Sequence, residues 1–325
     1  MIHAIQIEGT GGPEVMKWVE VEVGAPGPGM ARIRHTALGV NFIDIYYRKG
    51  VYKPPGGFPL INGQEGAGVV TAVGEGVAGL KPGDRVVYQG VIGAYAEERL
   101  IPAEKLVKLP EDLDDKVAAA SFLKGLTVQC LLRRTFKVER GQTILFHAAA
   151  GGVGTIATQW AHALGATVIG TVGSDEKASI ARENHCDHVI NYAREDFVAR
   201  VKEITKGEGV DVVYDSIGKD TFPGSLDCLK PLGMWVSFGQ TSGLPPEFPI
   251  SFLQHRGSLF ATRPTVSVYV ARRPALEASA HELFDALRSG IVRVAINREL
   301  PLKDVGEAHR AIEARETTGA TVLLP

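Results

Sequence analysis

The feature that most constrains the fold is a glycine-rich turn between an apolar segment and an amphipathic one. The run QTILFHA leads into Ala149–Gly154 (AAGGVG), which opens the run TIATQWAHALG. Strand, glycine turn and helix in this order form a variant of the G-x-G-x-x-G fingerprint, with Ala149 at its first position. Gly151 would let the backbone approach a pyrophosphate, and Gly154 would let helix and strand pack closely. The pattern predicts a dinucleotide-binding loop; the alternative is a turn that serves packing alone.

The rest of the chain divides into regions that differ in their pattern of apolar and polar residues. From 142 to 262, apolar runs alternate with amphipathic ones, which indicates a parallel sheet covered on both faces, a doubly wound α/β domain. Residues 1–110 carry short apolar runs between Gly/Pro turns, which predict a small, mostly antiparallel β-barrel. Helical spacing begins near residue 114. The tail predicts a helix over 272–289, a strand near 291–296, a helix over 303–316 and a last strand TVLLP.

Composition excludes several classes of protein. With 325 residues, 45% hydrophobic and 22% charged, the chain is globular and long enough for two domains or one interrupted domain. The net charge of −2 provides no general attraction to nucleic acid or to an anionic membrane. Cys130, Cys186 and Cys228 have no C-x-x-C spacing, which fits a reducing compartment. The start MIHAIQIEGTGG does not resemble a signal peptide and no membrane span is predicted, so we expect a cytoplasmic protein.

The end of the second predicted strand bears on the choice of nucleotide. A fold that recognises the ribose 2′-hydroxyl of NAD places an acid there. This chain has Gly173 and Ser174, followed by Asp175, Glu176 and Lys177. A hydroxyl and an ammonium suit a 2′-phosphate, which favours NADP(H). The alternative is that Asp175 or Glu176 is the NAD acid displaced by a residue or two, with Lys177 a solvated helix charge.

Several long motifs resemble one family, the zinc-independent quinone oxidoreductases of the zeta-crystallin-like branch of the medium-chain dehydrogenases/reductases, and bacterial NADPH:quinone reductases in particular. The resemblance extends over essentially the whole chain. It rests on GGPEVM, Asn41–Asp44 (NFID), Gln64–Val70 (QEGAGVV), Gly83–Val86 (GDRV), Ser121–Thr127 (SFLKGLT), the AAGGVG loop and Val236–Gly239 (VSFG).

The resemblance implies a GroES-like catalytic domain formed by both chain ends, 1–125 and 263–325, with a Rossmann NADP-binding domain at 126–262. It also implies a homodimer joined through an edge strand near 258–262. Catalytic candidates are Asn41, Asp44, Tyr46, Tyr52 and Gln64. The expected cofactor contacts are Asn41, Thr127, Ala150, Gly151, Gly152, Val153, Gly173, Ser174, Lys177, Tyr192, Ser216, Phe238, Gly239, Gln240, Arg263, Arg315 and Thr317.

The residues at the metal-ligand positions of zinc-dependent relatives differ here. The Gly-His-Glu element of those relatives reads Gly63–Glu65 (GQE), and none of the cysteines is close to it in sequence. Because Gln64 cannot replace an imidazole as an ordinary zinc ligand, we expect no catalytic metal.

Chemistry without a metal favours a quinone as the hydride acceptor. Reduction of a ketone generates an alkoxide, whose conjugate acid has a pKa of ~16, whereas a quinone becomes a phenolate-like anion with a pKa of ~10. The difference of ~6 units corresponds to roughly 8 kcal/mol less charge stabilisation, so hydrogen-bond donors suffice. Tyr46 and Tyr52 have the alternative role of barrel packing.

Two further functions fit the same sequence. Hydride addition to an enone or 2-alkenal gives a delocalised enolate, so a double-bond reductase is the alternative enzyme. Zeta-crystallin-like proteins also include members associated with lens structure or AU-rich RNA. The near-neutral charge and the lack of an aromatic-rich basic stripe argue against a primary nucleic-acid role.

Overall fold

The computed structural model describes residues 1–325, which divide into two compact units. Unit 1 contains Met1–Lys124, Leu276–Phe284 and Val294–Pro325, and unit 2 contains Gly125–Ala275 and Asp285–Arg293. Residues 263–275 and 285–293, which the resemblance places in the second part of the catalytic domain, belong to unit 2 by their contacts, and the domain boundaries stay a prediction. Helix α9 (Arg273–Arg288) contributes residues to both units. None of the helices is both long and apolar enough to cross a membrane.

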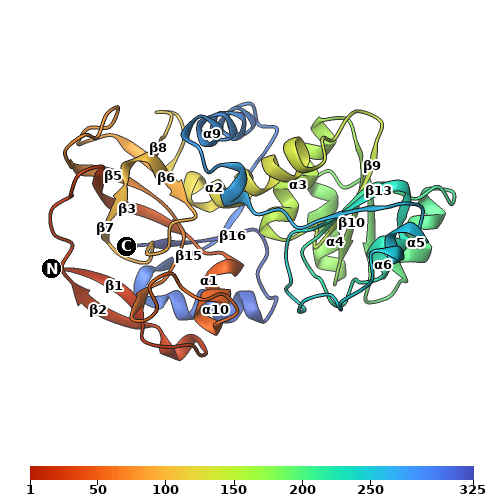
Figure 1. Cartoon of the computed structure of the whole chain (residues 1–325), viewed down its shortest axis with the longest axis horizontal. Helices are drawn as coiled ribbons and strands as arrows, with labels where there is room; N and C mark the ends of the chain where they lie inside the picture. Colours follow the sequence, from red (N-terminus) through yellow and green to blue (C-terminus); the bar gives the residue numbers. More distant parts are fainter. The chain divides into compact units, whose positions relative to one another are not determined.

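Unit 1 is built mainly on antiparallel strands, as its short apolar runs predict (Figure 1). The central strand β3 pairs with β5, β7 and β16, and over most of its length buried side chains alternate with half-buried or exposed ones. The larger sheet has the order β15-β16-β3-β5-β6-β8, with β7 beside β3, and a smaller sheet has the order β2-β1-β4. The strands are β1 (Ile2–Ile7), β2 (Lys17–Val21), β3 (Met30–Gly39), β4 (Leu60–Ile61), β5 (Glu65–Val73), β6 (Arg85–Gln89), β7 (Glu98–Pro102), β8 (Val107–Lys108), β15 (Ile296–Pro301) and β16 (Ala320–Leu324).

The strand predicted near 291–296 lies instead at β15. Its side chains alternate between half-buried and exposed, starting at Ile296, but the charged residues Arg298 and Glu299 obscure this alternation in the sequence. The following helix, predicted over 303–316, is α10 (Val305–Glu313), and it is preceded by a single 3-10 turn at Leu302–Asp304. The other 3-10 turns of unit 1 are Pro13–Val15 and Ala103–Lys105.

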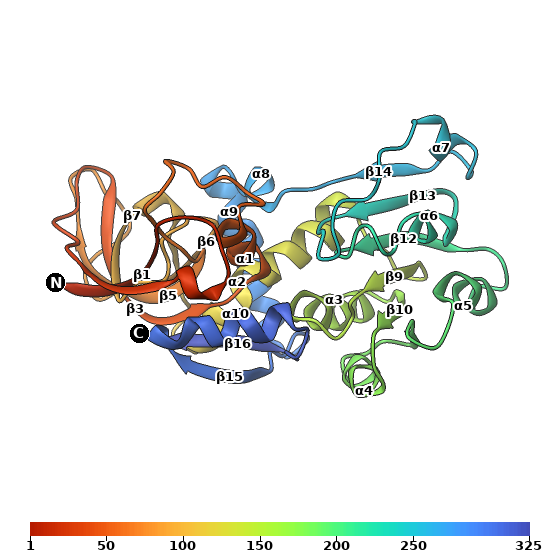
Figure 2. The same cartoon turned by 90° about the horizontal axis from the view of Figure 1, so that it is seen from below.

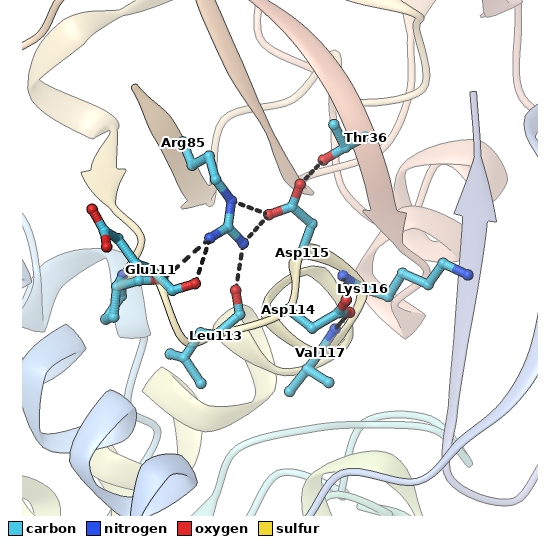
Figure 3. Close-up of polar contacts among 9 residues, drawn as sticks. Thr36, Arg85, Glu111, Leu113, Asp114, Asp115, Lys116 and Val117 are labelled. Carbon is cyan, nitrogen blue, oxygen red and sulfur yellow. Dashed lines mark hydrogen bonds and ion pairs between the residues drawn. The ribbon is translucent and has the colours of Figure 1, made fainter. Parts of the chain in front are cut away.

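Helix α2 (Asp115–Cys130) starts at a polar anchor (Figure 3). Asp114 accepts hydrogen bonds from the backbone N–H groups of Lys116 and Val117, at 2.8 and 3.2 Å, and so caps the helix. Asp115 accepts from Thr36 Oγ1 at 2.6 Å and from Arg85 Nε at 3.0 Å, which ties the first turn to β3 and β6. The arginine also donates to the carbonyls before the helix. This anchor sets where the later residues of α2 lie within unit 1.

Unit 2 contains a six-stranded parallel sheet with the order β11-β10-β9-β12-β13-β14. Because the order reverses after β11, right-handed crossovers place α3 and α4 on one face and α5 and α6 on the other (Figure 2). This is the doubly wound fold that the sequence predicts. The strands are β9 (Thr143–His147), β10 (Thr167–Val172), β11 (His188–Asn191), β12 (Val210–Asp215), β13 (Leu229–Ser237) and β14 (Phe260–Thr262).

Between these strands, the helices of unit 2 cover a core built around Leu145, Ile169, Val213 and Trp235. A π-helical turn at Leu131–Thr135 follows α2. The helices are α3 (Gly152–Ala163), α4 (Asp175–Glu183), α5 (Phe197–Ile204), α6 (Gly224–Asp227), α7 (Ser251–Gln254) and α8 (Val266–Tyr269).

Candidate active site

Asn41 stands at the N-terminus of α1 (Phe42–Lys49) and is almost fully buried. Its side-chain amide Nδ2 donates to Glu65 Oε2 at 2.7 Å. The other carboxylate oxygen of Glu65 accepts from the backbone N–H of Leu123 at 2.5 Å. Lys124 Nζ lies 3.4 Å from Glu65 Oε2 and 3.4 Å from the carbonyl oxygen of Val40. A buried anion and a buried cation therefore surround Asn41, and the Glu65 carboxylate orients its amide.

Asp44, three residues further along, is fully buried. Its Oδ2 accepts from the Asn41 backbone N–H at 2.9 Å and from the Tyr95 hydroxyl at 2.8 Å, while Oδ1 has no partner. Burial disfavours the charged form and raises the pKa of Asp44 from 3.8 to about 7, although both hydrogen bonds act in the opposite direction. Asp44 thus holds Asn41 at the start of α1, as a group that keeps its proton in mildly acidic solution.

A directional hydrogen-bond chain continues from Asp44 toward α10, which lies beside α1 (Figure 1). Arg48 Nη1 lies 3.3 Å from His309 Nδ1, and His309 Nε2 lies 3.1 Å from the Tyr95 hydroxyl oxygen. Because arginine only donates, His309 accepts at Nδ1 and carries its hydrogen on Nε2. Burial lowers the pKa of His309 to about 3, so the ring is neutral. The buried Arg48 guanidinium also pairs with Glu313 at 2.5 Å.

The remaining catalytic candidates of unit 1 lie close to α1 in sequence. Tyr46 and Tyr52 are half-buried, and their rings meet edge to face with centroids 5.2 Å apart. Phe42 adds a second edge contact to Tyr46 at 5.3 Å. Gln64, directly before β5, is buried, and its Nε2 has no hydrogen-bond partner. The two tyrosines therefore have contacts that suit the alternative role of packing in the barrel, whereas Gln64 has a side-chain donor without a partner.

The glycine turn in unit 2 has the geometry of a phosphate-binding loop. Gly151 is the N-cap of α3 and provides no side-chain acceptor for the N–H groups of the first turn, which includes Gly152 and Val153. By contrast, Asp196 caps α5 by accepting from two backbone N–H groups. A Cβ at Gly154 would lie 2.3 Å from the carbonyl oxygen of Ala148, so only glycine permits this helix–strand contact. The loop fits a dinucleotide pyrophosphate, which would accept from the uncapped N–H groups.

The residues expected near a 2′-phosphate meet at the ends of β10 and β11. A Cβ at Gly173 would lie 2.6 Å from the Tyr192 hydroxyl, so the tyrosine lies directly over this glycine. Ser174 is the N-cap of α4, and its Oγ accepts from the backbone N–H of Lys177 at 3.2 Å. The structure therefore brings these four predicted residues into one small region of unit 2.

Other predicted cofactor contacts lie where β12 and β13 end. A Cβ at Gly239 would lie 2.6 Å from the carbonyl oxygen of Ser216, so the two loops touch. Arg263 Nη2 donates to Gln240 Oε1 at 2.6 Å. The Phe238 ring packs on Phe146, with centroids 5.7 Å apart. The remaining predicted contacts are Ala150, which is buried in the glycine turn, Thr127, which is half-buried on α2, and Arg315 and Thr317, which follow α10 in unit 1.

Asp215 at the end of β12 organises this edge of the sheet. Its Oδ1 accepts from two backbone N–H groups, those of Ile217 and Gly218, at 2.9 and 3.1 Å. Its Oδ2 accepts from the side chains of Thr221, Ser225 and Trp235, at 2.7, 2.8 and 3.2 Å. The nearby His147 and the hydrogen bonds from Thr221, Gly218 and Ser225 hold the pKa of Asp215 below its usual 3.8, although burial acts in the opposite direction. The carboxylate is therefore ionised and braces the loop that contains Ser216.

Comparisons with known proteins agree over the whole chain. Residues 27–111 match the family model described as "Alcohol dehydrogenase GroES-like domain", and residues 152–283 match "Zinc-binding dehydrogenase". A quinone oxidoreductase of Pseudomonas aeruginosa is 49% identical over 100% of both chains, and a 2-haloacrylate reductase of a Burkholderia species is 48% identical over 100% of this chain and 99% of the relative. The crystal structure of Escherichia coli quinone oxidoreductase complexed with NADPH is 46% identical, covers 99% of this chain and 100% of that one, and has a TM-score of 0.97.

The chain belongs to the quinone oxidoreductase family of the medium-chain dehydrogenases/reductases. Its GroES-like and Rossmann-type regions confirm the predicted fold class.

The residues of this quinone oxidoreductase do not suit a zinc site, although the description of one matching family model mentions zinc. Both oxygens of Glu65 already accept hydrogen bonds, and Gln64 offers an amide in place of an imidazole. Burial raises the pKa of the Cys186 and Cys228 thiols to about 12, which disfavours the thiolate that zinc requires. No group of three or more His, Cys, Asp or Glu side chains is arranged to hold a metal ion.

Sequence reasoning missed several residues of this site. Glu65 and Lys124 were seen only as parts of matching motifs, and Tyr95, Arg48 and His309 were not singled out. Their partners lie from 24 to 265 residues away in the chain, so no local pattern signals them. A glutamate and a lysine within otherwise apolar segments were the only available hint.

Proposed function

We propose that this chain is an NADPH-dependent quinone reductase. The observation that carries the proposal is the similarity to the Escherichia coli quinone oxidoreductase–NADPH complex over 99% of this chain. The nucleotide loop of unit 2 supports it, because an uncapped helix N-terminus suits a pyrophosphate, and Lys177 in the first turn of α4 and Tyr192 after β11 suit a 2′-phosphate. NADPH, when bound, supplies the hydride.

The residues of unit 1 would bind and orient the quinone. Asn41 has one amide hydrogen engaged by Glu65, which leaves the other for a substrate oxygen. Gln64 Nε2 is the second donor, and Lys124 contributes positive charge in a buried environment. Two hydrogen-bond donors and a nearby cation suit the weakly basic anion that forms when a quinone accepts hydride. The roles of Asp44, Tyr46 and Tyr52 in this scheme are positioning and packing.

A second candidate is reduction of an activated carbon–carbon double bond, favoured by the 2-haloacrylate reductase relative at 48% identity. The two functions are separated by following NADPH oxidation at 340 nm with 1,4-benzoquinone, a 2-alkenal and 2-chloroacrylate in parallel. We expect the largest kcat/KM with benzoquinone. A larger kcat/KM with either alkene would overturn the quinone assignment and leave the alkene reductase in its place.

We also propose a cytoplasmic homodimer joined through β14. This strand is the last in the order of the unit 2 sheet, so one of its edges is unpaired within the chain. Phe260 on it is 55% exposed. An unpaired strand edge with an exposed aromatic residue is suited to pairing with a second copy. Sedimentation velocity is expected to give twice the chain mass, and a monomer at micromolar concentration would contradict the proposal.

A further inference from the structure

Asp175 is an acid close to the residues predicted to contact the 2′-phosphate. It is the first residue of α4 and lies shortly after β10, and a nucleotide-binding fold places the acid that accepts from the 2′-hydroxyl of NAD at the end of this strand. Without a partner, the Asp175 carboxylate would repel the two negative charges of a 2′-phosphate and would favour NADH over NADPH. The contacts of Asp175 therefore bear on which nucleotide unit 2 prefers.

Both oxygens of this carboxylate are occupied from the turn after β11. Asn191 Nδ2 donates to Asp175 Oδ1 at 2.8 Å, and Arg194 Nη2 lies 2.7 Å from Asp175 Oδ2. One partner is a buried amide, and the other is an exposed guanidinium. Between them they occupy both oxygens of the carboxylate and place one positive charge beside it, although the Asp175 side chain is itself 62% exposed.

The turn that holds Asp175 is itself well defined. Asn191 is paired with Val172 of β10, and its Oδ1 accepts from the backbone N–H of Ala193 at 3.1 Å. The backbone N–H groups of Arg194 and Glu195 both donate to the Asn191 carbonyl at 3.0 Å. The same turn contains Tyr192, whose hydroxyl lies over Gly173. One short segment therefore carries a predicted 2′-phosphate contact and both groups that restrain Asp175.

We propose that Asn191 and Arg194 are specificity-determining residues, which hold the Asp175 carboxylate away from the 2′-phosphate and so permit NADPH to bind. The inference rests on the proposed function only in taking NADPH as the cofactor. Arg194 acts through Asp175, by cancelling its charge. The competing explanation is that Arg194 binds the phosphate directly, and the two predict different results when Asp175 is neutralised.

A double-mutant cycle in nucleotide binding separates these explanations. The probes are adenosine 2′,5′-bisphosphate and adenosine 5′-monophosphate, whose affinities are measured by isothermal titration calorimetry without any turnover. Arg194→Ala is expected to lower the affinity for the bisphosphate by about fivefold, which is the effect of losing one exposed ion pair. The affinity for the monophosphate should not change. Asp175→Asn should change either affinity by less than about twofold, and in its background Arg194→Ala should have no further effect.

Two other variants serve as controls for the double-mutant cycle. Lys177→Ala is expected to weaken the bisphosphate in every background, because the proposed function places its ammonium on the phosphate. Arg182→Ala removes an exposed arginine of α4 and should leave both affinities unchanged, which controls for loss of one positive charge.

The proposal is overturned if Arg194→Ala lowers the affinity for the bisphosphate equally in the wild type and in the Asp175→Asn background, because Arg194 would then contact the phosphate itself. It is also overturned if Arg194→Ala has no effect. Equal affinity of the wild type for both probes would instead overturn the NADPH assignment. Failure of quinone reduction alone would leave these binding results intact, so the two proposals fail separately.

Discussion

Asp44 in unit 1 and Asp215 in unit 2 are both fully buried aspartates, yet their pKa values shift in opposite directions. The pKa of Asp44 is raised to about 7, and that of Asp215 is lowered from 3.8. Burial raises the pKa of each, so the difference lies in their partners. Asp215 accepts five hydrogen bonds spread over both oxygens, whereas Asp44 accepts two on one oxygen and leaves the other without a partner.

The charges around each aspartate reinforce this difference. The buried Glu65 carboxylate raises the pKa of Asp44, whereas His147 lowers that of Asp215. A buried carboxylate is thus an anion that braces a loop in unit 2 and a proton-holding group beside Asn41 in unit 1. Burial alone does not determine the charge; the number of donors aimed at the group does.

Removing the Asp215 side chain should have the largest effect. Asp215→Ala leaves the donors of Thr221, Ser225 and Trp235, and two backbone N–H groups, without an acceptor, which we expect to cost about 5 kcal/mol of unfolding free energy. Urea unfolding at pH 7 measures it. Asp220→Ala, an exposed aspartate in the same loop, is the control and should cost less than about 0.5 kcal/mol. Equal costs would show that the network contributes no stability.

The contribution of Asp44 to the free energy of unfolding should change with pH in the opposite direction to that of Asp215. Between pH 4 and 7 the carboxyl of Asp44 ionises in the unfolded chain but keeps its proton in the folded one, so its contribution to stability falls as pH rises. For Asp215 the stabilisation is complete above 3.8 and is lost as pH falls below that value.

Asp44→Asn tests this sign, because asparagine has the shape of the protonated acid and does not ionise. Relative to the wild type, the unfolding free energy of the variant should rise from pH 4 to 7 by up to roughly 4 kcal/mol and then level off. Urea unfolding of both proteins at pH 4.5, 6 and 7.5 measures the trend, and shifts of other groups cancel in the difference. A constant difference across this range would rule out a raised pKa.

Removing a single donor from each aspartate should have the smallest effect and compares them most directly. Thr221→Val deletes a hydrogen bond to an ionised acceptor and should cost about 1.5–3 kcal/mol. The Tyr95 hydroxyl also accepts from His309 Nε2, so Tyr95→Phe is measured in a His309→Phe background, where it deletes only the hydrogen bond to a protonated acceptor at pH 6 and should cost about 0.5–1.5 kcal/mol. Unfolding at pH 6 gives both values, and a larger cost for Tyr95→Phe would reverse the assignment of charge.

Local patterns were sufficient to predict the fold of unit 2. Continuous apolar runs indicate buried parallel strands, and the glycine turn between a strand and a helix marks the uncapped N-terminus of α3. In the tail, the charged Arg298 on the half-buried face and Glu299 on the exposed face masked the alternation of β15, which lies later than predicted. The site of unit 1 was predicted only through the resemblance of its motifs, because Asn41 and Glu65 meet across β3 and β5, from parts of the sequence that share no periodicity.

The sequence by itself determined which residues can do the chemistry: glycines where a phosphate approaches, a glutamine where zinc-dependent relatives have a histidine, and a lysine after the second strand of the nucleotide fold. The tertiary structure decided their states. In mildly acidic solution Asp44 keeps its proton and Asp215 loses it, and the Asp175 carboxylate is paired with Asn191 and Arg194. The reason is that the charge of a carboxyl group depends on the solvent, donors and cations around it, and in the folded chain many of these come from distant segments.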